Sequence, residues 1–545
     1  HLIERPMNTE LSNSALKHFI DIGVKLTTEH DTTKLLEQIL LSAKELANAD
    51  GGTVYSINDK QELKFETLLN DSLNMYMGGT SGKLINFPNI PMFVDGEVNH
   101  SALVAFAAAK DQVVNISDAY DAGDFDTNAA RKMDQQTGYR TKSVLTIPMK
   151  NHEKEMIGVL QLINAQNDNQ IVDFSAEVES MIVALGSMAA IALTNRQLID
   201  DMEELFQSLT RLIARAIDEK SPYTGGHCNR VPELTMMLAE AVCATHNGPL
   251  AEFYMEDKDK YELSVAGWLH DCGKISTPEA VMDKSTKLET IFDRIELVDC
   301  RLELAKNEIK TQYQSKIIDA LKTGESIDEL EQTLEQKLSE LDDDRDFLRK
   351  ANIGGEFMND SDQQRVADIA HKHRVTIGGQ EQDLLTANEI YNLSIAKGTL
   401  TAEEREIINH HMTVTIDMLE SLPFPKHLRN VPEYAGGHHE KMDGTGYPKK
   451  LTREQMSVPA RMMAIADIFE ALTAADRPYK PAKKLSECLK IMGFMKLDQH
   501  LDPDLFDVFI DQKVYLEYAH QFLDKSQIDE IIVDNIPGYI KPENR

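Results

Sequence analysis

The sequence has few cysteines and no long apolar run. Five cysteines are scattered along 545 residues, and no two of them form a CxxC pair. This usage argues against a disulfide framework and favours a reducing cytoplasm. No stretch of about 18 apolar residues occurs, so we expect no segment that spans a bilayer. The first residues, His1 to Pro6, lack a positively charged region followed by an apolar core, so the sequence predicts no signal peptide.

The sequence is also short of positive charge. Its 57 Lys and Arg residues face 90 Asp and Glu residues, which gives a formal net charge of -33. A general nucleic-acid binder needs a basic face, so this balance argues against such a partner. The length predicts two or more domains, each with its own core.

Histidines beside carboxylates recur in the second half of the chain. The segment from His438 to Pro448 holds two adjacent histidines, two carboxylates and a loop closed by glycines and a proline, which predicts a fixed backbone bearing metal ligands. Upstream lie His227 after a glycine pair, the pair His270-Asp271 before Gly273, and His411 at the end of the helical run Glu403 to His411. Downstream, Asp467 lies in an apolar helix, where an ionised carboxylate is costly without a cation.

These segments resemble the HD-GYP family, a branch of the HD metal-dependent phosphohydrolases. His270-Asp271 matches the family's HD doublet, Gly446-Tyr447-Pro448 its GYP triplet, and Arg477 to Lys480 its basic closing motif. The resemblance covers about residues 208 to 540, with one large interruption. It implies an all-α phosphohydrolase domain, which we place at residues 218–540.

The resemblance implies a metal site in which Asp271 bridges two ions. The expected ligands are five histidines and two aspartates: His227, His270, Asp271, His411, His438, His439 and Asp467. This donor set suits iron or manganese, with zinc or nickel as alternatives, better than magnesium. Some family members ligate a third metal through a glutamate where this chain has Tyr223, so the sequence predicts two ions. From the residues alone, His227 could instead cap a helix, and Lys274 could be a solvated lysine.

The resemblance also implies the reaction. A hydroxide bridging the two ions would attack phosphorus in line, while Lys274 holds the nonbridging oxygens. The family hydrolyses cyclic di-GMP to pGpG or GMP, and some members act on cyclic GMP-AMP. The matched positions imply that Tyr447 stacks a base and that Arg477 and Lys480 bind the second phosphate. The alternatives are an HD phosphohydrolase for another nucleotide and a catalytically weak receptor for a cyclic dinucleotide.

The N-terminal part alternates between helix and strand patterns. After a tail at residues 1–15, we expect a helix over residues 16–50 that Gly51-Gly52 stops, then strands at 53–57, 63–68, 143–150 and 157–163 and a helix at 175–193. This order implies a sheet covered on one face and resembles a GAF sensor domain, an α+β fold with an antiparallel sheet, over residues 16–195. The cyclic-nucleotide signature of such domains is incomplete at Asn164-Ala165, so dimerisation or an unknown small ligand is expected.

A single apolar stripe runs from Ser175 to about Asp218. A helix of this length would extend about 60 Å, which is too long for the surface of one domain. We expect residues 196–217 to form a linker helix that pairs with a second copy in a parallel homodimer. The alternative is a helix broken near Asn195 that lies on the second domain.

An insertion at about residues 288–395 separates His270 from His411. Apolar residues at helical spacing from Leu288 to Leu321 and from Leu330 to Leu348 predict an antiparallel helical hairpin, whose second helix opens on a capping box, Ser326 to Glu329. The hairpin could contact a partner or be a passive elaboration. The remaining histidines are not expected to bind metal: His371 and His373 should be solvated, and His410 should face away from the site.

Overall fold

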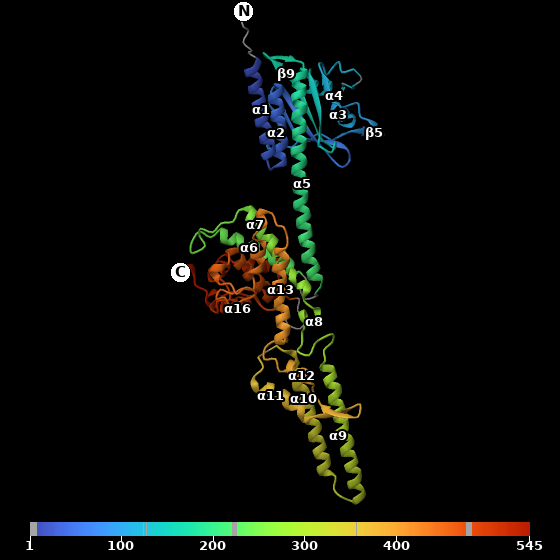
Figure 1. Cartoon of the computed structure of the whole chain (residues 1–545), viewed down its shortest axis with the longest axis vertical. Coiled ribbons are helices and arrows are strands. Elements are labelled where there is room, and N and C mark those ends of the chain that lie inside the picture. The colour runs from blue at the N-terminus through green and yellow to red at the C-terminus, as the bar shows by residue number, and fades with distance from the viewer. Residues whose placement is uncertain are drawn as a thin grey trace, which may run out of the picture. The chain divides into compact units, whose positions relative to one another are not determined.

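The computed structural model describes residues 8–544 except 124, 127, 221–225, 356 and 476–481. Tyr223, Arg477 and Lys480 therefore lie outside the described residues. The chain forms two compact units, His1–Leu205 and Phe206–Arg545 (Figure 1).

The N-terminal unit is built on an antiparallel sheet, as the sequence predicts. Its strands run in the order β3-β2-β1-β9-β8-β7, with β10 added to β9 and β4 to β2. The strands are β1 (Ala49–Ile57), β2 (Glu62–Asn70), β3 (Met75–Gly78), β4 (Ile90–Pro91), β7 (Val114–Ile116), β8 (Val144–Lys150), β9 (Met156–Asn167) and β10 (Gln170–Val172). A short ribbon pairs β5 (Phe93–Val94) with β6 (Glu97–Val98). The long central pairs β1–β2 and β1–β9 run in continuous register apart from one irregularity at Val54/Tyr55.

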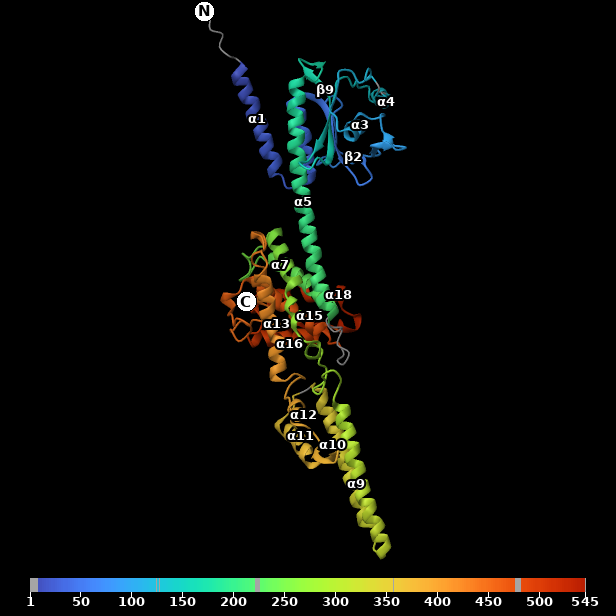
Figure 2. The same ribbon diagram turned by 45° about the vertical axis from the view of Figure 1, so that its right-hand side comes forward.

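Helices cover both faces of this sheet, so the expectation of a single covered face was wrong. Neighbouring residues of β1 point to opposite faces: Val54 lies in a core with α2 (Thr32–Ala47) and the first half of α5 (Ala176–Lys220). Tyr55 lies in a second core with α3 (Leu103–Lys110). Figure 2 shows α3 and α4 (Asn128–Thr137) on the opposite side of the sheet from α5. The short, alanine-rich α3 gave no apolar stripe from which its packing could be predicted.

The helix expected over residues 16–50 is two helices. α1 (Asn8–Thr28) ends before Asp31, whose side chain accepts a hydrogen bond from the amide of Lys34 at 2.9 Å and caps α2. α2 ends on Asn48, whose φ of 45° is left-handed. The glycines Gly51 and Gly52 lie inside β1, where a Cβ on Gly52 would come within 2.7 Å of a main-chain oxygen. They allow close strand packing and do not stop the helix.

α5 is one unbroken helix of 45 residues from Ala176 to Lys220. It continues through Asn195, so the expected long helix is confirmed and the broken alternative is wrong. By length and composition it could cross a membrane, with a window of mean hydropathy 1.6, but 39% of that window is buried inside the protein. Ile182, Leu185 and Ala189 pack into the core of the N-terminal unit, which accounts for the apolar character of this half of the helix.

The C-terminal unit has a helical core. Helices α6 (His227–Cys243), α7 (Asp257–Leu269), α13 (Ala402–Glu420), α14 (Val431–Gly436), α15 (Val458–Thr473), α16 (Leu485–Leu497), α17 (Pro503–Asp511) and α18 (Val514–Phe522) bury one apolar cluster. The short elements η1 (Cys272–Ser276) and α8 (Glu279–Met282) follow α7. α13 starts as predicted, because Thr401 and Glu404 form a capping box, but it runs nine residues beyond His411, where the sequence analysis ended it.

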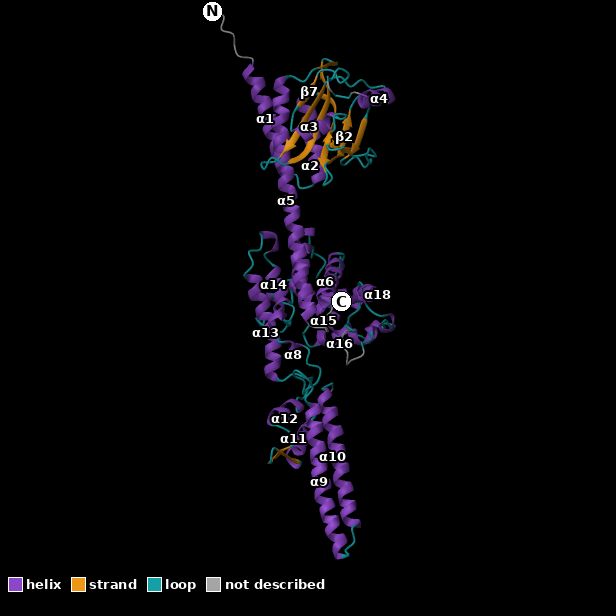
Figure 3. Ribbon diagram, turned by 90° about the vertical axis from the view of Figure 1, so that its right-hand side faces the viewer, coloured by secondary structure: helices purple, strands orange, loops and turns teal. Residues whose placement is uncertain are grey.

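The segment between α8 and α13 forms an arm with a core of its own. The arm comprises α9 (Ile295–Thr323), α10 (Asp328–Ile353), α11 (Asp360–Lys372), β11 (Arg374–Ile377), β12 (Gln380–Asp383) and α12 (Ala387–Leu393). Figure 3 shows α9 and α10 side by side as a hairpin, with the short β11–β12 ribbon beside α11. The ribbon was not predicted.

Three expectations for the arm were wrong. α9 begins at Ile295 and not at Leu288, and Ile291 is 97% exposed in the preceding loop. The capping box is absent, since Ile327 is the N-cap residue of α10 and has no side-chain cap. His373 is buried and its Nε2 lies 2.9 Å from Asp344 Oδ2, whereas His371 is exposed as expected.

Candidate metal centre

The pair His270-Asp271 lies where α7 ends, and the chain there packs tightly against α13. The Gly273 amide donates a hydrogen bond to Thr415 Oγ1 at 2.9 Å. A Cβ on Gly273 would lie 2.0 Å from the main-chain oxygen of His411, so no side chain fits at this position. Glycine therefore brings the HD doublet beside α13, although 140 residues separate the two segments along the chain.

Four side chains from three helical segments form the carboxylate-rich cluster: His227, His270, Asp271 and Asp467. His227 Nε2 lies 3.2 Å from Asp271 Oδ2 and 3.3 Å from Asp467 Oδ1. His270 Nε2 lies 3.3 Å from Asp271 Oδ2 and 3.4 Å from His227 Nε2. Nitrogen and oxygen donors thus converge on one point from residues that the sequence spreads over 240 positions.

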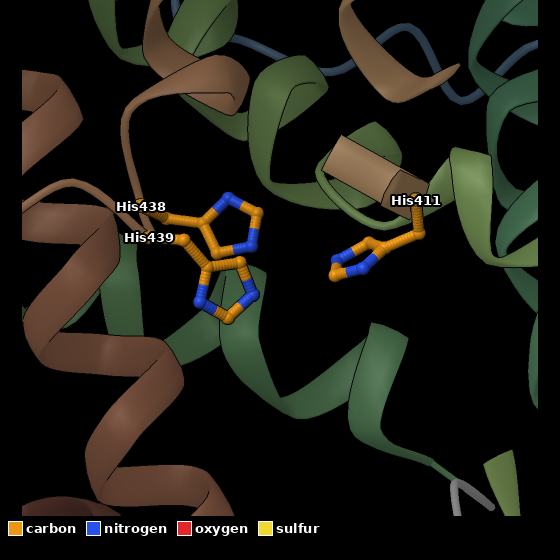
Figure 4. Close-up of side chains that lie close together, drawn as sticks. All are labelled: His411, His438 and His439. Atoms are coloured by element: carbon orange, nitrogen blue, oxygen red, sulfur yellow. The ribbon is translucent and has the colours of Figure 1, made fainter. Parts of the chain in front are cut away.

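Three further histidines form the imidazole cluster: His411, His438 and His439. His411 comes from α13, and the adjacent pair follows α14 (Figure 4). Their candidate ligand atoms lie within 4.8 Å of one another. His411 Nε2 lies 3.3 Å and His438 Nε2 3.9 Å from Asp271 Oδ1. One carboxylate therefore faces both clusters, Oδ2 towards the carboxylate-rich cluster and Oδ1 towards the imidazole cluster.

Main-chain carbonyls orient three of the rings. His270 Nδ1 donates to Gly267 O and His438 Nδ1 to Ala435 O, each at 2.7 Å, and His411 Nδ1 donates to Ile408 O. A carbonyl can only accept, so each Nδ1 carries a proton, and Nε2 is the atom that can bind a metal ion once it carries no proton itself. All three Nε2 atoms point towards Asp271.

Among the described residues, three buried atoms of this region have no hydrogen-bond partner: Asp271 Oδ1, His411 Nε2 and His438 Nε2. Buried polar atoms are nearly always paired, because an unpaired one costs about 1–3 kcal/mol. Lone pairs of two imidazoles and one carboxylate meet here with no hydrogen-bond donor between them. Divalent cations bind this combination of nitrogen and oxygen ligands, and such ions would satisfy all three atoms.

The electrostatics of the carboxylate-rich cluster favour positive charge. Burial acts to lower the pKa of His270, but Asp271 and Asp467 raise it to about 9. The pKa of His227 is also raised, because Glu470, Asp271 and Asp467 outweigh its burial. Burial acts to raise the pKa of Asp271, yet Lys274 and the histidines hold it well below its usual range. Protons occupy the place that a metal ion would take.

Two histidines of the imidazole cluster, His438 and His439, are held in the neutral form. Burial lowers the pKa of His438 well below its usual value, and His439 and His270 lower it further. Burial likewise lowers the pKa of His439 to about 4. Tyr447 stacks on the ring of His439, with centroids 4.9 Å apart and planes 15° apart. Neutral imidazoles are the form that binds metal, so these two histidines need not release a proton first.

Lys274 is ion-paired with Asp271 and its side chain is 22% exposed. Burial acts to lower its pKa, but Asp271 and Asp467 raise it, so the amine stays charged. The solvated alternative is therefore wrong. Part of the side chain stays exposed beside the clusters.

The loop from His438 to Pro448 differs from the prediction in its carboxylates. Glu440 is buried and accepts hydrogen bonds from the amides of Lys449 at 2.7 Å and Leu451 at 2.9 Å, which closes the loop. Asp443 is exposed and accepts from the amide and hydroxyl of Thr445. Both carboxylates shape the loop that carries the histidines and bind nothing in the clusters. His410 is exposed, as expected.

The sequence analysis missed Glu470. This residue is 1% exposed and accepts hydrogen bonds from His227 Nδ1 and from Arg230 Nε, the latter at 2.7 Å. A carboxylate behind a ligating histidine fixes the ring and makes it a stronger donor. The available signal was its spacing: Glu470 follows Asp467 by three residues, on the same face of an apolar helix.

Comparisons with known proteins agree with the division of the chain into an N-terminal sheet unit and a C-terminal helical unit. A family model for the GAF domain matches residues 31–193, and one for the HD domain matches residues 385–505. The HD match contains His411, His438, His439 and Asp467, whereas His227 and the HD doublet lie before the arm and outside it.

Individual relatives share short segments with the chain. A 3'3'-cGAMP-specific phosphodiesterase of Vibrio cholerae is 39% identical over 113 residues, which cover 21% of this chain and 25% of that protein. A cyclic di-GMP phosphodiesterase of Pseudomonas aeruginosa is 44% identical over 73 residues, 13% of this chain and 17% of that protein. The GAF domain of an Acinetobacter phosphoenolpyruvate-protein phosphotransferase superposes with a TM-score of 0.26 and 15% identity, over 34% of this chain and 98% of that structure.

The antiparallel sheet with helices on both faces and the GAF match coincide in the N-terminal unit. The helical core, the histidine clusters and the HD match coincide in the C-terminal unit. The chain therefore contains a GAF domain at residues 31–193, followed by a helical unit that contains an HD domain at residues 385–505.

Proposed function

We propose that this chain is a metal-dependent phosphodiesterase that hydrolyses a cyclic dinucleotide. The substrate is either cyclic di-GMP, with pGpG or GMP as the product, or cyclic GMP-AMP. The observation that carries the proposal is Asp271, whose two oxygens face two histidine clusters. Two close cations joined by a carboxylate are the arrangement used for in-line displacement at phosphorus. The names of the similar phosphodiesterases support a cyclic dinucleotide over other phosphodiesters.

Seven side chains would hold two ions. One ion would be bound by the carboxylate-rich cluster, His227, His270, Asp271 and Asp467. The other would be bound by Asp271 and the imidazole cluster, His411, His438 and His439. When bound, the ions lower the pKa of water and neutralise phosphate charge. Imidazoles outnumber carboxylates and no thiolate takes part, which favours iron or manganese over magnesium, with zinc or nickel as alternatives.

The protein's own residues would position and stabilise the substrate. The Lys274 ammonium, held by Asp271 at the edge of the clusters, would contact a nonbridging phosphate oxygen as negative charge develops on it. Tyr447 packs on His439, so a base stacked on Tyr447 would lie beside the imidazole cluster. Arg477 and Lys480 remain candidates for the second phosphate.

The test is turnover by protein purified without oxygen, so that bound iron is retained. Metal content is measured first, and the protein is then incubated with cyclic di-GMP, cyclic GMP-AMP and linear pGpG. We expect two ions per chain and conversion of a cyclic dinucleotide to linear products. Tight nucleotide binding without turnover, in protein loaded with iron or manganese, would instead support a receptor. Turnover of other nucleotides alone would support a different HD phosphohydrolase.

A homodimer through α5 is a second proposal with an observation of its own. Exposed apolar residues on this helix alternate at spacings of four and three: Leu198, Met202, Leu205, Leu209 and Leu212. This spacing is the heptad pattern of a coiled coil, and Asn195 lies seven residues before Met202 in the same register. At such a position an asparagine that pairs with its copy in the second helix favours a parallel two-helix coiled coil. Replacing Met202 and Leu209 by lysine should convert the dimer to a monomer in light scattering. The exposed Glu204→Lys change, outside this heptad pattern, is the matched control.

A further inference from the structure

The last residue of α5 holds the segment that follows the HD doublet. The Lys220 ammonium donates to the main-chain oxygens of Lys274 at 3.1 Å, Ile275 at 2.5 Å and Thr277 at 2.6 Å. An ammonium has three donors, and three carbonyls here use all of them. The carbonyls belong to η1 and the residue just after it, a segment that starts directly after Asp271. The contact therefore fixes η1, and with it Lys274, to the end of α5.

Two residues earlier, Asp218 holds the other segment of the carboxylate-rich cluster. Its Oδ2 accepts a hydrogen bond from the amide of Gly226 at 3.1 Å, and its Oδ1 accepts from the amide of Cys228 at 3.3 Å. These amides flank His227 at the start of α6, where unpaired N–H groups and the helix dipole favour a carboxylate. Asp218 is 7% exposed, so water competes little for these bonds.

We propose that Asp218 and Lys220 are positioning residues through which α5 sets the geometry of the carboxylate-rich cluster. One side chain fixes the backbone around His227, and the other fixes the backbone after Asp271. The buried neighbour Ile217 anchors this turn of α5 in the helical core, so both contacts start from a fixed point. The imidazole cluster takes its histidines from α13 and from the loop after α14, and Asp271 is the one ligand that it shares with the carboxylate-rich cluster.

The proposal predicts an asymmetric loss. Groups that orient metal ligands typically change metal affinity by about 10–100-fold when they are removed. Lys220→Met keeps the aliphatic stem and removes all three donors, so the ion held by the carboxylate-rich cluster should bind about tenfold more weakly. The ion held by the imidazole cluster shares only Asp271 with this segment and takes its other three ligands from elsewhere, so it should lose less affinity. Lys220→Arg, which retains charge and donors, should restore most of the loss.

The experiment uses the full chain and two measurements on each of Lys220→Met, Lys220→Arg, Asp218→Asn and Arg215→Met. Arg215 is the control, because its side chain is on the same helix and 78% exposed. Manganese titration followed by electron paramagnetic resonance gives the affinity of each ion. Hydrogen–deuterium exchange of the metal-free protein reports on the backbone without any metal.

We expect faster exchange in residues 272–277 for Lys220→Met and in residues 226–230 for Asp218→Asn. In each variant the ion of the carboxylate-rich cluster should lose more affinity than the other ion. Exchange and both affinities equal to the unmodified protein, or the same loss in Arg215→Met, would overturn the proposal. It rests on the proposed function only through the two ions. An unmodified protein without turnover would refute that function, whereas the differences in exchange and affinity between variants would still decide the role of α5.

Discussion

The arm and the metal centre both bury histidine beside aspartate, with different outcomes. In the arm, His373 Nε2 lies 2.9 Å from Asp344 Oδ2, and Arg365 lies 3.2 Å from the other oxygen of Asp344. Each carboxylate oxygen there has a donor. In the metal centre, the ring nitrogens of His411 and His438 face Asp271 Oδ1 and no hydrogen bond forms.

The difference separates a structural ion pair from a ligand site. Burial alone does not, because His373 and His411 are both almost inaccessible. What distinguishes them is the hydrogen bonding of the carboxylate: each oxygen of Asp344 accepts a hydrogen bond in the arm, whereas in the centre five imidazoles surround two aspartates and Asp271 Oδ1 accepts none. A buried carboxylate whose oxygens all accept hydrogen bonds stabilises the fold, whereas buried lone pairs without a hydrogen-bond partner need a cation.

The largest effect should come from Asp271, which both clusters share. Asp271→Asn keeps the shape of the side chain and removes its charge, so neither ion retains a bridging carboxylate. We expect loss of both ions, measured by elemental analysis. We also expect turnover to fall by about a thousandfold, because metal ions contribute several kcal/mol to stabilising such transition states. Asp443→Asn removes an exposed aspartate from the loop between His438 and Pro448 and should keep both ions. Two tightly bound ions in Asp271→Asn would remove the distinction between centre and arm.

A smaller effect is expected from a change at Glu470. Like Asp344 in the arm, Glu470 accepts a hydrogen bond on each of its oxygens, but one of its partners is the predicted metal ligand His227. Glu470→Gln weakens the acceptor behind His227 Nδ1 and leaves the ligand set intact. Affinity for the ion of the carboxylate-rich cluster should fall by about 10–100-fold, measured by competition with a chelator. A variant with unchanged affinity would place Glu470 with the purely structural pairs.

The sequence allowed much of this centre to be predicted, because each predicted ligand lies in a short local pattern. His270-Asp271 precedes a glycine stop, and His438-His439 opens a glycine-rich loop. The long α5 was also predictable from its apolar stripe. The hydrogen bond between Glu470 and His227 could not be predicted, since it joins residues 243 positions apart.

Other misses have local causes. The β11–β12 ribbon has four residues in each strand and depends on Gly378 and Gly379, both at positive φ, which sequence periodicity does not detect. The contacts of Asp218 and Lys220 go to main-chain atoms, which carry no sequence signal. Local patterns thus indicate which side chains bear ligand atoms, whereas the groups that orient them appear once the chain has folded.

A still smaller effect, confined to the arm, should follow from His373→Ala. Removal of the imidazole leaves one oxygen of buried Asp344 without its donor, which costs about 1–3 kcal/mol. Hydrogen exchange should quicken in α11 and the β11–β12 ribbon, while both metal ions remain bound. His410→Ala, at an exposed position of α13, is the matched control and should change neither. Loss of metal from His373→Ala would show that the arm and the centre are not separate.

The mildest test uses pH on the unmodified arm. Burial acts to raise the pKa of Asp344, but hydrogen bonds from His373 and Arg365 hold it below its usual value. A carboxylate whose pKa is lower in the folded state adds stability above its unfolded pKa of about 3.9, and this stability is lost as pH falls through the folded pKa. Protection of α11 from hydrogen exchange, corrected for intrinsic rates, should therefore be constant from pH 7 to about 5 and should decline below about pH 4. In His373→Ala the decline should be shallower, because less stabilisation remains to be lost on protonation. An equal decline in both proteins would mean that His373 does not set the charge state of Asp344.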